Sequence, residues 1–110
     1  MNGQYLHIGF IWRGPAKLKE LTPIFDLAED WIMYGGNNWI VYTSRSFLEW
    51  NGWIRAVLGP EDSVLILELT DPLIAVGLMP QWVWDWLNKE RTIPESTALG
   101  LKPLLPPTLR

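Results

Sequence analysis

The chain has 110 residues, a hydrophobic content of 48%, a charged content of 19% and a formal net charge of −3. This length fits a single domain, and the composition excludes wholesale disorder and a fibrous repeat. The absence of cysteine excludes disulfides, thiolate metal sites and cysteine nucleophiles. The slightly acidic charge disfavours nucleic acid as the main partner, because phosphate binding normally needs a basic excess. Neither a signal peptide nor an apolar run of membrane-spanning length is recognisable, so we expect a cytoplasmic protein without a membrane partner.

The first part of the chain predicts a strand followed by a helix. Residues 4–12 alternate between two sets of side chains, which is typical of a strand. Apolar residues at helical spacing after Pro15 predict a helix that reaches Leu27. Pro23 lies inside this pattern and should either kink the helix or split it, with Thr22 capping the second piece.

The middle of the chain predicts a β-hairpin and a second helix. Residues 31–34 and 39–43 are aromatic and β-branched runs on either side of a Gly-Gly-Asn-Asn turn, which favours a hairpin. The next apolar residues recur at helical spacing, after a cap at Ser44 or Ser46, and a Gly-Pro pair ends the predicted helix.

The element order predicts the fold class. Residues 63–70 are expected to form a largely buried strand, which completes the order strand, helix, strand, strand, helix, strand. This is the split βαβ plan, so we expect an α+β fold of ferredoxin-like topology. Residues 73–78 could add a short fifth strand, and residues 80–91 predict a C-terminal helix. The predicted domain is 1–91, followed by an extended or disordered proline-rich tail over 92–110.

Eight tryptophans are more than a domain of this size can easily bury, and exposed aromatic clusters are typical of interfaces. In the predicted last helix Trp82 and Trp86 share an apolar face, whereas Trp84 falls outside it and is expected to be exposed. An alternating strand over these residues is the alternative. We predict a protein-interface surface made by Trp82, Trp84 and Trp86 together with Tyr5 and His7.

His7 is the single histidine and would be the natural acid–base group near neutral pH. It has no acidic neighbour in sequence and shares a predicted sheet face with Tyr5, Gly9 and Ile11, opposite the helices, where a dimer surface would lie. The carboxylates occur in three local sets without the spacing of an acid–base pair or a metal site, so we interpret them as solvated surface. We therefore predict no enzyme activity, no cofactor and no metal.

Three arginines are the candidates for nucleic-acid binding. Arg13 and Arg45 each follow a predicted strand, but these two strands should run antiparallel, which places the arginines at opposite ends of the sheet. Arg55 lies on the predicted second helix. Arg13, Arg45 and Arg55 are the site residues of this alternative function.

Several segments carry a resemblance to a known family. The features are a first strand beginning Tyr5-Leu6, the phrase Asp30-Trp31 to Tyr34, the strand over 38–44 and the run 61–69. Together they resemble the small ferredoxin-like subunit of the CRISPR adaptation complex and its stand-alone relatives. The resemblance implies a homodimer built on the sheets, in which residues 73–78 extend the sheet edge of the partner.

The resemblance does not carry over the activity of that family. Its members usually have a metal-binding aspartate at the end of the first strand, whereas this chain has Gly9-Phe10-Ile11-Trp12-Arg13. We therefore expect a non-enzymatic interaction module, a homodimer that engages a further protein through an aromatic surface, such as a phage-derived or defence-related accessory factor. The alternative is a nucleic-acid-binding, catalytically degenerate relative of the CRISPR subunit. A small-molecule-binding module, the third hypothesis, would show an apolar pocket between helices and sheet.

Overall fold

A computed structural model describes residues 3–70 and 73–91 of the chain. Its seven elements, in chain order, are β1 (Gln4–Ile11), α1 (Leu18–Phe25), β2 (Asp30–Tyr34), β3 (Asn38–Thr43), α2 (Phe47–Arg55), β4 (Ser63–Leu69) and α3 (Gln81–Leu87). The order and type of these elements confirm the predicted α+β class. The tail predicted over 92–110 lies outside the described residues.

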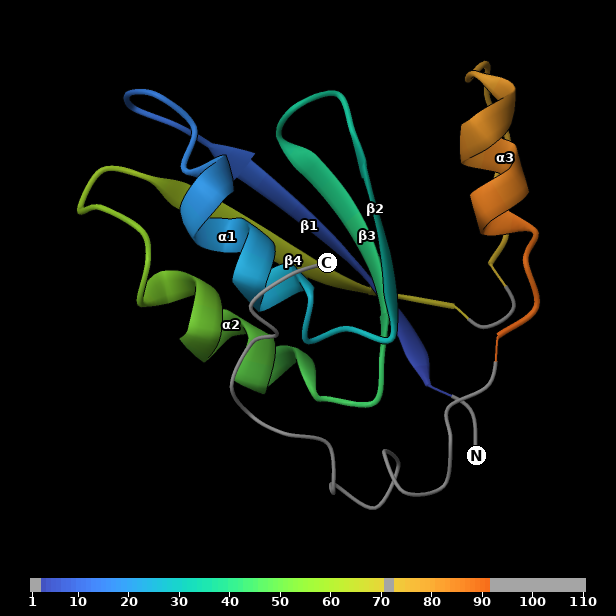
Figure 1. Ribbon diagram of the computed structural model, residues 1–110, viewed down its shortest axis with the longest axis horizontal. Coiled ribbons are helices and arrows are strands. Elements are labelled where there is room, and N and C mark those ends of the chain that lie inside the picture. Colours follow the sequence, from blue (N-terminus) through green and yellow to red (C-terminus); the bar gives the residue numbers. More distant parts are fainter. Residues whose placement is uncertain (1–2, 71–72, 92–110) are drawn as a thin grey trace.

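The four strands form one antiparallel sheet in the order β2-β3-β1-β4 (Figure 1). β1 pairs with β3 on one side and with β4 on the other, and β2 pairs with β3. From the central strand β1 the chain passes through α1 to the outer strand β2, and the hairpin then leads to the second central strand, β3. α2 carries the chain from β3 to the other outer strand, β4. This order is consistent with the predicted ferredoxin-like plan.

The predicted hairpin is confirmed, and its turn has a clear backbone reason. Gly35 and Gly36 have φ values of +69° and +70°, a region that residues with a side chain rarely adopt. Positive φ values are typical of the tight turns that join antiparallel strands, and glycine adopts them without a steric penalty. The turn residues therefore set the register in which Tyr34 of β2 lies opposite Asn38 of β3.

The main core lies between one face of the sheet and the helices α1 and α2. The ring of Phe25 from α1 stacks on Trp39 from β3, with centroids 4.7 Å apart and ring planes 5° apart. Trp50 from α2 is fully buried and packs against Phe25 with centroids 5.8 Å apart. Alternate β1 residues, Leu6, Ile8 and Phe10, complete this face.

A buried hydrogen bond fixes α2 to β3. The indole N–H of Trp50 donates to Thr43 Oγ1 over 3.1 Å, and both side chains are fully buried. The same oxygen accepts the backbone N–H of Arg45 at 3.0 Å, just before the helix begins. Ser46 is the N-cap of α2, because its hydroxyl accepts the Glu49 N–H at 3.2 Å.

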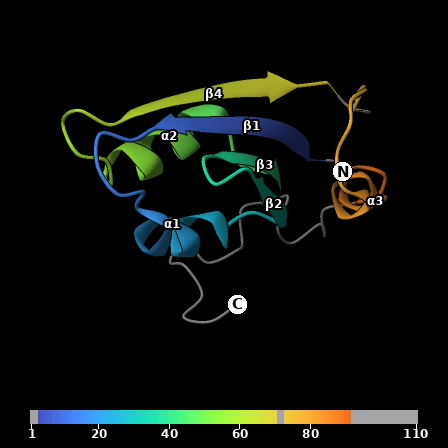
Figure 2. The ribbon, with the colours of Figure 1, turned by 90° about the horizontal axis from the view of Figure 1, so that it is seen from above.

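The third helix lies on the other side of the sheet. Figures 1 and 2 both show α3 separated from α1 and α2. Val83 of α3 is buried in a second apolar cluster with Ile32, Ile40 and Tyr42 from β2 and β3 and with Tyr5 from β1. The C-terminal helix is thus confirmed, and the alternative of a strand over residues 82–86 is wrong.

Three local predictions are corrected by the structure. α1 continues through Pro23 as one helix, and Thr22 bonds back to the Leu18 carbonyl over 2.8 Å instead of capping a second piece. β4 is not largely buried, because it is an edge strand with α2 on one face only. Residues 73–78 form no strand. The chain leaves β4 to bring α3 over β2 and β3, and that path takes this segment away from the β4 edge.

Candidate interaction surface

The side of the sheet opposite α1 and α2 is here called the open face. The strand registers place on it Tyr5, His7, Gly9 and Ile11 from β1, Ile32 and Tyr34 from β2, Asn38, Ile40 and Tyr42 from β3, and Leu65, Leu67 and Leu69 from β4. The predicted location of Tyr5 and His7, opposite α1 and α2, is therefore confirmed. α3 covers the part over β2, β3 and the Tyr5 end of β1, and no element of the described residues covers the rest of β1 and β4.

The uncovered part carries an aliphatic patch, the β4 patch, made of Ile11, Leu65 and Leu67. These side chains are 69%, 62% and 47% exposed. They surround a hollow of about 300 Å³ that is also lined by His7 and Asn38. Apolar side chains gathered on one face of a small domain are typical of an interaction site.

A second exposed apolar group lies in the segment 73–79, between β4 and α3. Ile74, Val76 and Leu78 are 88%, 99% and 99% exposed. They recur at every second residue, which is the period of a strand, although the segment has no strand partner here. Together with α3 and the end of β4 the segment borders a mostly apolar hollow of about 400 Å³.

The outer edge of β4 is open. Within the described residues β4 pairs with β1 alone, so the backbone groups of its other edge have no strand partner. The strand contains neither proline nor lysine, the residues that usually protect an exposed edge. This edge can accept another strand.

His7 occupies the centre of the open face. Its Nε2 lies 2.6 Å from the hydroxyl oxygen of Tyr34, and the two rings meet edge-on with centroids 5.8 Å apart. Burial lowers the pKa of His7 below its ordinary value and raises the pKa of Tyr34. The imidazole is therefore mainly neutral at pH 7, and its Nε2 is hydrogen-bonded to the Tyr34 hydroxyl.

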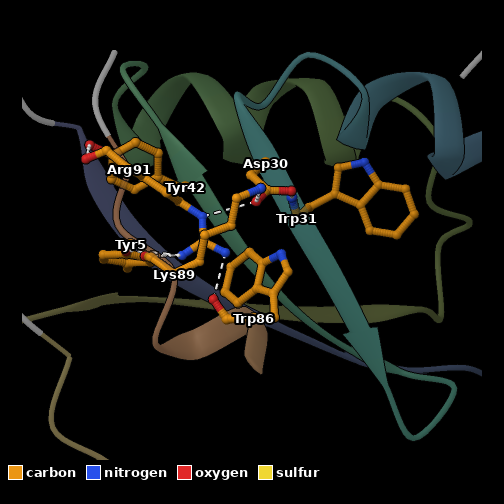
Figure 3. Close-up of polar contacts among 7 residues, drawn as sticks. All are labelled: Tyr5, Asp30, Trp31, Tyr42, Trp86, Lys89 and Arg91. Carbon is orange, nitrogen blue, oxygen red and sulfur yellow. Dashed lines mark hydrogen bonds and ion pairs between the residues drawn. The ribbon is translucent and has the colours of Figure 1, made fainter. Parts of the chain in front are cut away.

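The end of α3 is anchored to the sheet by Arg91, as Figure 3 shows. Its Nε donates to Asp30 Oδ2 over 2.9 Å, and its other nitrogens donate to the carbonyls of Trp86 (2.6 Å) and Lys89 (3.0 Å). The guanidinium lies 3.9 Å from the centroid of the Trp86 ring. The Arg91 side chain is only 5% exposed, so this contact is a largely desolvated ion pair with stacking.

Asp30 is held in its charged form by this arrangement. Burial alone would raise its pKa. The hydrogen bond from Arg91, the neighbouring Trp86 indole and the positive charges of Arg91 and Lys89 outweigh that effect and keep the pKa of Asp30 below its usual value. The Asp30 carboxylate therefore holds the end of α3 at any pH near neutrality.

The predicted aromatic interface residues are distributed differently from the expectation. Trp82 is the exposed member of the triplet at 54%, and Trp84 is only partly exposed, so the prediction about Trp84 is wrong. The reason is that α3 docks through Val83, which turns Trp82 outward. Tyr5 is buried, and Trp86 packs beside it and beneath Arg91. Two of the five predicted interface residues, Tyr5 and Trp86, therefore lie between α3 and the sheet.

The three arginines do not form one basic surface. Arg45 follows β3 beside Gln4, whose side-chain amide donates to the Arg45 carbonyl at 2.8 Å. Arg13 lies at the opposite end of β1, as predicted, and pairs with Glu61 at 3.5 Å on the surface. Arg55 borders the same loop as Arg13, where the carboxylate of Asp62 adds negative charge.

Over residues 3–70 and 73–91, no group of three or more histidine, aspartate or glutamate side chains is placed to bind a metal ion. None of the described helices has the length and apolar character needed to cross a bilayer.

No protein-family model, no curated protein and no solved structure matches this chain. The kinship with the CRISPR adaptation subunit accordingly stays a prediction. The tryptophan content predicts an aromatic surface on α3, whereas the exposed apolar side chains of this region are mainly aliphatic. For Ile74, Val76 and Leu78 the signal in the sequence is their recurrence at every second residue.

Proposed function

We propose that this protein is a non-enzymatic interaction module that forms a homodimer through its open face and the outer edge of β4. The observation that carries the proposal is the run of exposed aliphatic side chains from the β4 patch to the segment 73–79. Removing apolar surface from water contributes roughly 25 cal/mol per Å², so burying these side chains against a partner would be favourable.

A second copy of the chain fits this surface because the chain supplies both complementary parts. The β4 edge offers unpaired backbone groups, and the segment 73–79 has the alternating apolar pattern of a strand without a place in its own sheet. In a two-fold arrangement the segment of each protomer would pair with β4 of the other. The β4 patches would then face each other across the sheets.

The surroundings of the β4 patch also favour burial. The hollow at its centre is lined by nine residues without a charged side chain: His7, Gly9, Phe10, Ile11, Asn38, Ser63, Val64, Leu65 and Leu67. Because no charge would have to be desolvated there, association would not meet the penalty that opposes burial of ions. Trp82, at the far end of this surface, is a further anchor for a partner protein.

Self-association is tested by sedimentation velocity over a concentration series, with the variant Leu67→Glu. A carboxylate at the centre of the buried face should raise the dimer Kd by on the order of a hundredfold, since each dimer contains two copies of the change. The matched control is Leu48→Glu on α2, where an exposed leucine (70%) lies outside the open face and the same charge should have no effect.

A third variant separates strand pairing from apolar contact. Val76 is 99% exposed, so Val76→Pro removes one backbone N–H with little loss of packing in the folded protomer. If the segment adds to a partner sheet, this change weakens the dimer by about tenfold or more. A monomer at all concentrations would overturn the proposal, and so would equal dimer affinity for wild type and Leu67→Glu.

A further inference from the structure

The position of His7 suggests how association through the open face is controlled. His7 lies on the central strand β1, opposite Leu67 of β4 and Ile40 of β3. It borders the hollow of the β4 patch, which places the single ionisable side chain of that hollow inside the surface that a dimer would bury.

The groups that face His7 supply no counter-charge. Its hydrogen-bond partner is the Tyr34 hydroxyl, and the other titratable neighbour on its face is Tyr5. The segment 73–79 contains no titratable residue. Of the nearby carboxylates, Glu68 of β4 lies opposite Leu6 on the other side of the sheet, and Asp85 of α3 is exposed and accepts from Gln81.

The remaining carboxylate of the open face, Asp30, is already engaged by two cations. Asp30 lies at the other end of β2 from Tyr34 and is paired with Arg91 at 2.9 Å and with Lys89 at 3.7 Å. No described side chain therefore stands ready to neutralise an imidazolium at position 7. Protonation would also oblige both ring nitrogens to donate, while the side chains near the ring that can accept, Tyr34, Asn38 and Ser63, are all uncharged.

We propose that His7 is an acid switch for self-association: the neutral imidazole permits the open faces to bury each other, and its protonation separates them. This inference rests on the proposed homodimer. In the dimer each charged ring would be buried in an apolar surface without a partner, whereas in the monomer it reaches water. Proton binding and dimerisation therefore oppose each other.

The proposed switch weakens dimerisation at acidic pH, which is the opposite of what the net charge of the chain would do. The chain carries a net charge of −3, so lowering the pH reduces the repulsion between two copies and would by itself favour association. The burial of His7 lowers its pKa already in the monomer, and further burial would lower it again. Weaker association below pH 6 would therefore point to the histidine.

The test compares sedimentation velocity of the full chain at pH 7.5 and pH 5.5 for wild type and His7→Gln. Because two imidazoles change charge per dimer, the wild-type Kd should rise by about tenfold or more at pH 5.5. In His7→Gln, which keeps a neutral polar side chain, the Kd should be the same or lower at the acidic pH. Dimers of equal Kd at both pH values in the wild type would overturn the switch and leave the homodimer intact.

A second measurement does not depend on the variant folding. His7 is the single histidine, so its imidazole C–H proton gives one unambiguous NMR titration curve. The apparent pKa should fall as the protein concentration is raised from the monomer to the dimer range. A pKa that is independent of concentration while the protein dimerises overturns the switch alone. A wild-type monomer at both pH values overturns the switch together with the homodimer.

Discussion

At the scale of single residues, the tryptophans show how aromatic side chains are divided between core and surface. Trp39 and Trp50 are buried and Trp82 is the exposed one, while the other five are partly covered. Partial burial is the usual state of so large a side chain, because its ring can pack while its edge remains in water. A high tryptophan content therefore does not by itself indicate a binding surface.

Thr43 is the residue at which a small change should have a large effect on folding. Thr43→Val keeps the shape but leaves the buried Trp50 N–H without its acceptor at 3.1 Å. Such a loss costs about 1–3 kcal/mol, which urea unfolding would measure. Thr43→Ser retains the hydroxyl and is the matched control, with a smaller loss from the missing methyl group. Equal stability of Thr43→Val and wild type would contradict this role of the hydrogen bond.

At the scale of elements, α3 depends on a contact beyond its own last residue. Its apolar anchor is Val83, and the ion pair between Arg91 and Asp30 ties the following turn to β2. A helix of seven residues is too short to be stable alone, so its structure depends on these tertiary contacts. The helix and its anchor are therefore expected to unfold together.

Arg91→Met tests this dependence. The methionine retains packing on Trp86 but leaves the Asp30 carboxylate without its main partner. We expect faster amide hydrogen exchange throughout α3 and a global loss of about 1–3 kcal/mol from the lost charged hydrogen bond to Asp30. Lys89→Met is the control, because Lys89 is mostly exposed and 3.7 Å from Asp30, so its loss should have an effect below about 0.5 kcal/mol. Unchanged exchange in α3 after Arg91→Met would show that apolar packing alone holds the helix.

At the scale of the whole molecule, Asp62 joins two segments that are far apart in sequence. Its carboxylate accepts the backbone N–H groups of Gly59 (2.9 Å) and Arg13 (3.2 Å) and pairs with Lys17. These bonds connect the loop before β4 with the connection between β1 and α1. Hydrogen bonds from Lys17, Gly59 and Arg13 lower the pKa of Asp62 from 3.8 to about 2.

The depressed pKa of Asp62 predicts how stability depends on pH. The Asp62 carboxyl binds a proton less readily in the folded state than in the unfolded chain. Its contribution to the free energy of unfolding is therefore fully present above about pH 4 and is lost as the pH falls towards 2. Asp62→Asn should lower the free energy of unfolding at pH 7. Between pH 4 and pH 2 the free energy of unfolding of this variant should fall less than that of the wild type. Urea unfolding of both proteins across this range measures the effect. Parallel pH profiles for the two proteins would assign the acid sensitivity to other carboxylates.

The sequence by itself determined the order and type of the elements, the glycine turn at Gly35-Gly36 and the fold class, because periodicity and turn chemistry are local properties of the chain. Only the tertiary structure decided which apolar side chains stay exposed. Leu65 and Leu67 resemble core residues in sequence, yet β4 lies at the edge of the sheet and α3 covers the other end of the open face. The pairing of Asp30 with Arg91, 61 residues apart, likewise had no local signal. Burial and ion pairing depend on which segments meet in space, and that is set by the whole fold.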